Sequence, residues 1–368
     1  MKRRNFISGL AALTSIFALQ GTASVLFNKK RKGFNFLLLG DLHYDKIEHH
    51  DMEYVKRNFP NDVNQILNYS RITDKNLPAL LRVVKEQTKR YDADFILQLG
   101  DFLEGICGSQ KLARSQAKEF IDNIAYQKFE IPFITVKGNH DITGEGAKEV
   151  YADTILPWQA KELGQAITSA NVSYVHNNVR FILFDCYAKE SIEWLKIVLQ
   201  NHKEDVLFFC THMPVVPYEA RSNWYQYYGD DQKREELLNL LGSHHAIVLS
   251  GHLHKSSVVV RSTVQGSFIQ VGLCGNIPDL DAPIKDKLKG VEHYSEDLVN
   301  LEPGFSPSSV QLRREILKKE APLIRYYEYA DCAGYGLIKI TDNHQVILSI
   351  FSNDNIEPWT TVNLSDLF

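Results

Sequence analysis

The sequence predicts an α/β protein whose functional groups lie at the ends of its strands. Three observations lead to this fold class: apolar runs of strand length recur along the chain, segments with helical spacing separate several of them, and the last third contains further strands. Five of the runs end near Asp, Asn or His. Because open α/β sheets bind ligands outside the carboxyl ends of their strands, we expect a site there.

Length and charge narrow the class of protein. A chain of 368 residues can bury one large core or two smaller ones. The net charge of -4 argues against a partner that is a nucleic acid polymer, although a single nucleotide stays open as a ligand. None of the five cysteines stands in a C-x-x-C pair, so we interpret them as free thiols and leave a disulfide open.

The first 27 residues predict a targeting segment rather than part of the fold. Arg3 and Arg4 precede a charge-free, mildly apolar run over 6–27, and Gly21-Thr22-Ala23 fits a cleavage site. Arg-Arg-x-Phe-Ile resembles the twin-arginine export signal of bacteria. We therefore expect a signal peptide over 1–27 and a periplasmic protein without stable membrane association after cleavage. The rival interpretation is an uncleaved membrane anchor, because the run is long enough to cross a bilayer.

The first apolar run, 34–39, predicts a strand that ends at Gly40-Asp41-Leu42-His43. Asp41 and His43 are two apart, so in an extended chain both project to one side and can reach one cation. The alternative for Asp41 is a helix cap in a surface turn. Residues 44–75 are polar and aromatic, and we interpret them as an inserted loop that shapes a substrate pocket. The spacing over 78–91 predicts a helix.

A second strand over 95–99 is followed by Asp101 and Glu104. The two oxygens of a carboxylate can bind two cations at once, so Asp101 is the candidate for a bridging ligand. Its alternative role is again a helix cap, since 110–128 has the pattern of a helix.

A third strand over 131–136 leads to Gly138-Asn139-His140-Asp141. Asn139 offers a neutral carbonyl oxygen, His140 is either a metal ligand or a proton donor, and Asp141 is placed to orient the His140 ring by a hydrogen bond. Taken alone, these residues are equally consistent with a tight turn.

The middle of the chain continues the pattern. We predict a strand pair over 172–175 and 181–184, with Asp185 as the cap of a helix over 192–199. A buried strand over 205–210 ends before His212, for which the alternative is a core histidine with satisfied ring nitrogens.

A strand over 246–249 is followed by Gly251, His252 and His254. A His-x-His pair after a strand favours metal binding, and Gly251 permits a sharp turn beside the metal. The remaining chain predicts strands at 258–260, 267–271, 323–329, 336–340 and 346–351. Residues 279–320 form a charged excursion that ends in a short helix over 310–319. We expect one domain over 34–368, with insertions at 44–75 and 279–320.

The motifs are specific as an ordered set, although each one alone is a weak signal. The chain reads Gly-Asp-x-His, Gly-Asp-x-x-Glu, Gly-Asn-His-Asp, a His at a strand end and Gly-His-x-His, each after an apolar strand. From about 34 to 254 this set resembles the calcineurin-like metallophosphoesterase family. The resemblance implies two packed, mixed β-sheets flanked by helices. The continuation over 102–105 departs from the protein phosphatase branch, and the metal-binding Tyr of purple acid phosphatases is missing.

The resemblance also implies a role for each position. It implies two divalent transition-metal ions, and the mixed N/O ligand set suits Mn, Fe, Zn or Ni. A hydroxide between the two ions would attack the phosphorus. His140 would protonate the leaving group or steady the phosphoryl oxygens, and Glu104 and Asp141 would lie behind the ligands. The ligands would be Asp41, His43 and His254 for one ion, Asn139, His212 and His252 for the other, and Asp101 for both.

These roles lead to a hydrolase that cleaves a small phosphate mono- or diester, with a nucleotide or a lipid head group among the candidate substrates. The alternative is a catalytically silent metal-binding scaffold on the same fold. Every expected ligand and the candidate acid are present, which favours the enzyme.

Overall fold

The computed structural model describes residues 33–219, 225–277, 280–300 and 309–368. The expected signal peptide and its alternative, the membrane anchor, lie outside these ranges. Within the described ranges, no helix combines the length and apolar character that crossing a membrane requires.

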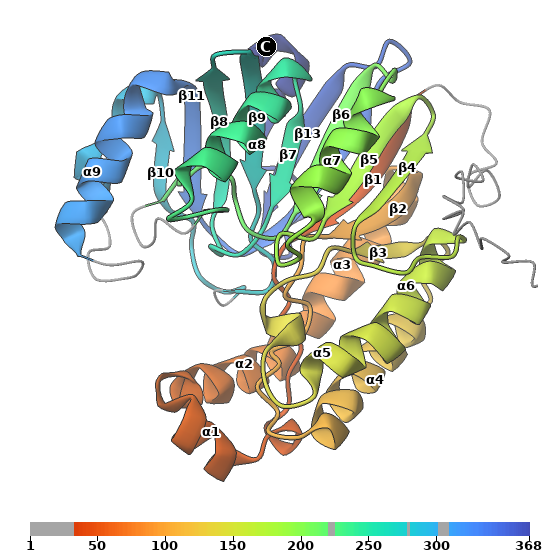
Figure 1. Ribbon diagram of the computed structural model, residues 1–368. Helices are drawn as coiled ribbons and strands as arrows, with labels where there is room; N and C mark the ends of the chain where they lie inside the picture. Colours follow the sequence, from red (N-terminus) through yellow and green to blue (C-terminus); the bar gives the residue numbers. More distant parts are fainter. Residues whose placement is uncertain (1–32, 220–224, 278–279, 301–308) are drawn as a thin grey trace, which may run out of the picture.

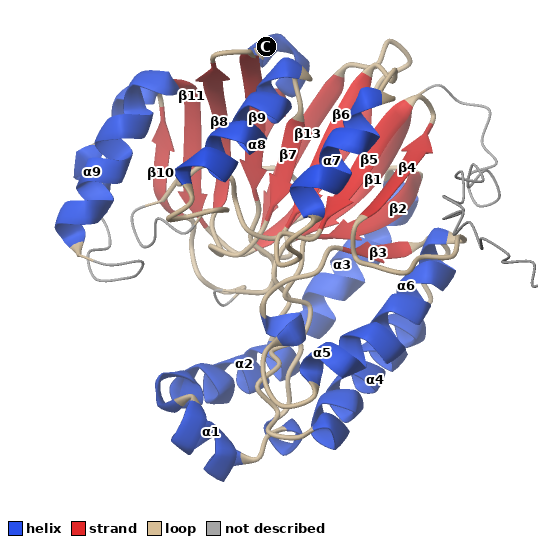
Figure 2. Ribbon diagram, viewed as in Figure 1, coloured by secondary structure: helices blue, strands red, loops and turns tan. Residues whose placement is uncertain are grey.

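Two mixed β-sheets form the centre of the molecule, as expected (Figure 2). In the first sheet, of order β14-β13-β12-β1-β2-β3, strands β1, β2 and β3 are parallel. In the second, of order β10-β11-β8-β9-β7-β6-β5-β4, strands β5, β6, β7 and β9 are parallel. The strands are β1 (Phe34–Leu39), β2 (Ala93–Gln98), β3 (Phe133–Thr135), β4 (Val172–His176), β5 (Val179–Phe184), β6 (Val206–Thr211), β7 (Ile247–Ser250), β8 (Ser256–Thr263), β9 (Gly266–Gly272), β10 (Lys285–Lys289), β11 (Ile324–Asp331), β12 (Gly334–Ile340), β13 (Val346–Ser352) and β14 (Thr360–Asn363).

The two sheets pack face to face through an apolar layer. Phe36 of the first sheet meets Phe181 and Phe208 of the second edge to face, each with ring centroids 5.4 Å apart. These rings belong to one buried cluster that draws on both sheets. Burial of this layer holds the two sheets in a fixed relation, which the site at their common edge requires.

Helices cover the outer faces of both sheets (Figure 1). On the first sheet, apolar residues of α3 and α4 pack against β1 and β2. On the second sheet, α7, α8 and α9 bury their apolar sides against β6, β8 and β11. The helices are α1 (Met52–Asn58), α2 (Val63–Lys75), α3 (Leu77–Arg90), α4 (Gln110–Gln127), α5 (Ala147–Val150), α6 (Leu156–Leu163), α7 (Ser191–Gln200), α8 (Asp231–Ser243) and α9 (Val310–Glu320).

The expectation of a loop over 44–75 is wrong, because most of this insertion is helical. The Asp51 side chain accepts hydrogen bonds from two backbone N–H groups and so caps the start of α1. In α2, Ile66, Tyr69 and Ile72 recur at three-residue spacing and bury one face. The second insertion contains β10 as well as the helix that we expected, here α9.

The expected cap role of Asp185 is also wrong. Helix α7 begins at Ser191, with Glu190 as its N-cap residue. The carboxylate of Asp185 instead accepts a hydrogen bond from the Tyr187 N–H at 3.0 Å and forms an ion pair with Lys137. Asp185 therefore stabilises the turn after β5.

Candidate metal centre

The polar residues at the five strand ends converge at one edge of the two sheets. Strands β1, β2 and β3 run parallel in the first sheet, and β6 and β7 run parallel in the second. Their carboxyl ends therefore face the same side, where the connecting loops gather between the sheets and helices α1, α2 and α5 (Figures 1 and 2). The expected site residues follow these strand ends.

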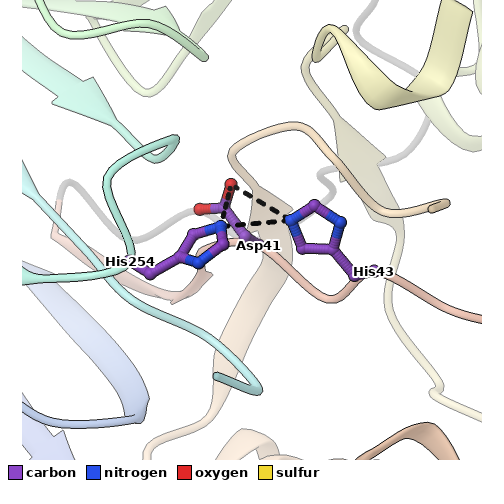
Figure 3. Close-up of side chains that lie close together, drawn as sticks. All are labelled: Asp41, His43 and His254. Atoms are coloured by element: carbon purple, nitrogen blue, oxygen red, sulfur yellow. Dashed lines mark hydrogen bonds and ion pairs between the residues drawn. The ribbon is translucent and has the colours of Figure 1, made fainter. Parts of the chain in front are cut away.

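Asp41, His43 and His254 form the first cluster (Figure 3). The Nε2 atoms of His43 and His254 are 3.1 Å apart, and Asp41 Oδ1 lies 3.5 Å from Nε2 of His254 and 4.0 Å from Nε2 of His43. Asp41 and His43 are almost completely buried. One cation could therefore touch all three side chains.

Asp101, His212 and His252 form the second cluster. Asp101 Oδ2 lies 2.9 Å from His212 Nε2, which in turn lies 3.2 Å from His252 Nδ1. The His252 backbone N–H donates to both Asp41 oxygens, at 3.0 and 2.9 Å, so the second cluster is attached directly to the first.

Asp101 stands between the two clusters, where a bridging ligand would have to be. Its Oδ2 atom lies 3.9 Å from His43 Nε2 of the first cluster and 2.9 Å from His212 Nε2 of the second. A carboxylate in this position can contact two cations at once.

The loop after β3 lies against the bridging carboxylate. The His140 N–H donates to Asp101 Oδ1 at 2.8 Å, and Asn139 Oδ1 accepts a hydrogen bond from the Tyr187 hydroxyl at 3.4 Å. A Cβ atom on Gly138 would collide with Asp101. Glycine is therefore required for the close approach of this loop to Asp101.

Gly251 serves a similar purpose on the second sheet. A Cβ atom there would lie 2.6 Å from Asp41 Oδ2, well inside van der Waals contact. We expected Gly251 to permit a sharp turn. The structure shows instead that glycine is needed here because the loop that carries His252 passes close to the Asp41 carboxylate.

Glu104 holds the candidate ligand His43 and the neighbouring His140. Its Oε2 atom accepts a hydrogen bond from His43 Nδ1 at 2.6 Å, and its carbonyl oxygen accepts one from His140 Nδ1 at 2.7 Å. Glu104 is fully buried, and its Oε1 atom accepts from Gln65 of α2 at 3.0 Å. Sequence reasoning missed Gln65, because only the packing of the insertion brings it to this carboxylate.

The Asp141 carboxylate binds backbone N–H groups rather than the His140 ring. It accepts hydrogen bonds from the N–H groups of Gly138, Leu103 and Asp101. It therefore ties the loop after β3 to the loop after β2, while Glu104 orients the ring that Asp141 was expected to orient.

The hydrogen bonds also determine which ring nitrogens face the clusters. His212 Nδ1 donates to the Leu99 carbonyl oxygen at 2.8 Å, and His43 Nδ1 donates to Glu104. In the neutral form that a metal ion requires, each ring would carry its one proton on Nδ1 and turn an unprotonated Nε2 toward the clusters. Such orientation of a histidine by an acceptor behind it is typical of metal ligands.

The electrostatics differ among the histidines of the centre. Burial opposes a charge on His212, but Asp101 and Asp41 outweigh it and raise the pKa of His212 to about 9. Burial and the neighbouring His140 lower the pKa of His43 well below its ordinary value, and burial with His212 lowers the pKa of His252 to about 3. Although burial opposes ionisation of Asp101, the nearby His212 and His140 lower its pKa. Neutral nitrogens and anionic oxygens are the forms that bind divalent cations.

The pKa values of Glu104 and His140 are both raised above their ordinary values. Burial raises the pKa of Glu104 to about 8. Burial opposes a charge on His140, but Glu104 and Asp101 outweigh it and raise the pKa of His140 to about 9. Imidazole nitrogens and carboxylate oxygens come together in three groups, the third of which is His43, Glu104 and His140. This mixed donor set fits divalent ions.

Two packed mixed sheets with these clusters at their common edge define a metallophosphoesterase, a hydrolase that acts on phosphoester bonds. The chain belongs to the calcineurin-like phosphoesterase family, whose model matches residues 34–256.

A solved structure agrees with the fold. A dimetal phosphatase from Danio rerio is 14% identical, with a TM-score of 0.50, over 90% of this chain and 99% of that one. At this identity the likeness concerns the fold alone. The anchor in the inner membrane complex of Plasmodium is 13% identical, with a TM-score of 0.48, over 90% of this chain and 88% of that one. A purple acid phosphatase from yellow lupin (Lupinus luteus) seeds is 12% identical, with a TM-score of 0.49, over 89% of this chain and 53% of that one. No curated protein matches the sequence significantly.

Proposed function

We propose that the chain hydrolyses a small phosphate mono- or diester at a pair of divalent transition-metal ions. The observation that carries this proposal is the position of Asp101, whose Oδ2 atom lies 3.9 Å from a histidine of the first cluster and 2.9 Å from a histidine of the second. One ion would be held by Asp41, His43 and His254, the other by Asn139, His212 and His252, and both by Asp101.

The ligand set supports Mn, Fe, Zn or Ni at these positions, because it mixes imidazole nitrogens with carboxylate and carboxamide oxygens. Two such ions would neutralise the charge of the phosphate and lower the pKa of a water molecule between them. Glu104 keeps the His43 ring in the orientation for binding, and Leu99 does the same for His212.

His140 is the residue that we assign to the leaving group. Its Nδ1 atom is engaged by the Glu104 carbonyl oxygen, which leaves Nε2 for the departing oxygen of the ester. The His140 side chain is 18% exposed, whereas Asp101 and His212 behind it are almost completely buried. A proton given from Nε2 to an alkoxide would speed its departure.

A panel of substrates tests the proposal. The purified protein, loaded with Mn²⁺, is assayed against p-nitrophenyl phosphate, its bis ester, cyclic nucleotides and phospholipid vesicles. We expect hydrolysis of at least one ester, its loss on treatment with a chelator and its return when metal is restored. Two bound ions without turnover of any ester would instead support the catalytically silent scaffold.

We also propose that the protein acts in the periplasm after export through its twin-arginine-like segment. The paired Arg3 and Arg4 before an uncharged run support this location. N-terminal sequencing of the protein from a periplasmic fraction should begin near Ser24. A chain that still begins at Met1 and sediments with membranes would support the anchor.

A further inference from the structure

A groove of about 640 Å³ opens beside the metal centre. Tyr54 and Phe59 of the helical insertion line one part of it, and Asn139, Thr143 and Tyr187 line another. The volume lies within the range of pockets that take small organic ligands.

The groove adjoins the loop that carries the proposed proton donor. Asn139 belongs both to its lining and to the proposed ligands, and His140, the proposed proton donor, is the next residue. Thr143 and Gly144 continue the lining along the same loop. If the proposed function holds, the part of the substrate that His140 protonates therefore points into this groove.

Three aromatic side chains contribute to the lining. The rings of Tyr54 and Phe59 lie 5.9 Å apart between centroids, tilted by 44°, and both side chains are only partly buried. Tyr187 adds a third ring from the connection after β5. Partly exposed aromatic rings in a groove favour a flat, unsaturated ligand that can stack on them.

Tyr187 is held rigidly in its position. Its N–H donates to Asp185 Oδ1 at 3.0 Å, and Asp185 forms an ion pair with Lys137. The Lys137 ammonium lies 6.0 Å from the centroid of the Tyr187 ring. Because the Tyr187 hydroxyl also donates to Asn139, this ring joins the groove to the metal centre.

The charged residues of the lining narrow the choice of ligand further. Glu145 and Glu149 accompany a single cation, Lys148. Carboxylates accept hydrogen bonds from amino and hydroxyl groups but repel further phosphates. An acyl chain would leave these charges without partners. The lining therefore favours a ring with attached N–H or O–H groups and no second phosphate.

We propose that this groove binds a planar, ring-bearing leaving group, and that a nucleoside is the chemical class that fits it. The base stacks on Phe59 and its neighbours, and the amino and sugar hydroxyl groups donate to the glutamates. The substrate is then a nucleoside monophosphate or a cyclic nucleotide rather than a di- or triphosphate. This assignment rests on the proposed function, which places the phosphate of the substrate at the metal ions.

The experiment compares substrates with and without a ring in the Mn-loaded protein. Phe59→Ala should lower kcat/KM for 5′-AMP about 10-fold, since it removes a stacking surface, and should change kcat/KM for glycerol 3-phosphate less than about twofold. Tyr126→Ala, which alters a ring that is 81% exposed on α4 and outside the groove, should change neither value. Equal losses for both substrates in Phe59→Ala, or a wild-type preference for glycerol 3-phosphate or ADP over 5′-AMP, would overturn the assignment.

Adenosine supplies a second readout that needs no turnover. Isothermal titration calorimetry should show adenosine binding to the Mn-loaded wild-type protein, and at least about fivefold weaker binding to Phe59→Ala and to Tyr54→Ala. If wild-type protein does not bind adenosine, the nucleoside assignment fails even where phosphoesters are hydrolysed. Adenosine binding without hydrolysis of any ester would contradict the proposed function alone. Thermal unfolding of each variant shows whether its fold is intact.

Discussion

Replacement of Glu104 by alanine is expected to lower metal affinity at one of the two proposed positions more than at the other. Glu104 is fully buried and accepts a 2.6 Å hydrogen bond from Nδ1 of His43, a proposed ligand of the first ion only. This hydrogen bond satisfies the buried Nδ1–H group of His43, and a buried donor left without an acceptor costs about 1–3 kcal/mol. Its loss should therefore reduce affinity at the first position about 10–100-fold, because each 1.4 kcal/mol is about a factor of ten.

The assay is a titration of metal-depleted protein with Mn²⁺, followed by calorimetry and by elemental analysis of the bound metal. Glu104→Ala should bind one ion with nearly wild-type affinity and the second about 10–100-fold more weakly. Glu104→Gln keeps an acceptor oxygen for His43 and should lose less than about tenfold. The control is Glu119→Gln. The Glu119 carboxylate pairs with Lys46 and not with a histidine of the site, so this change should leave metal affinity at both positions unaltered. Wild-type affinity at both positions of Glu104→Ala, or an equal loss at both, would refute the reasoning.

Four further outcomes are expected. Asp101→Asn should lose both metal and activity, and elemental analysis that finds two ions would contradict the bridging role. His140→Ala should retain its metal but lose about 10²–10⁴-fold in kcat, so a variant with full activity would exclude His140 as the proton donor. Gly251→Ala should lower metal content, because its Cβ would lie 2.6 Å from an Asp41 oxygen, and unchanged content would show that the loop can shift. Burial raises the pKa of Glu204, but hydrogen bonds from Arg180 and others outweigh it and lower that pKa from 4.5 to about 2. The resulting stability is present above pH 4.5 and lost as the pH falls toward 2, so Glu204→Gln should flatten the acid limb of a plot of melting temperature against pH.

The sequence predicted the centre well because its residues stand at the ends of strongly apolar strands. The run over 34–39 coincides with β1, and the polar residues after β1, β2 and β6 lie in the loops where we expected them. A buried strand of a parallel sheet reads as a continuous apolar run, so its end is easy to locate. The position of the end then places Asp41, Asp101 and His212 at one edge.

The sequence predicted the surroundings of the centre less well. Helices α1 and α2 are short and polar, and only a few spaced residues such as Ile66 and Ile72 mark their buried side. Strand β10, with the sequence Lys-Asp-Lys-Leu-Lys, lies at the edge of its sheet, where charged residues are common and the apolar signal is weak. Contacts such as Gln65 with Glu104 join residues that are 39 positions apart, so they depend on tertiary packing that no local pattern encodes.

The division of the ligands between the two sheets has a mechanical consequence. Asp41 and His43 follow a strand of the first sheet, and His254 follows a strand of the second. An ion shared by these three side chains would connect the first sheet to the second at their common edge. Sliding of one sheet along the other would separate these side chains. Metal occupancy of the centre and the rigidity of the molecule should therefore increase together.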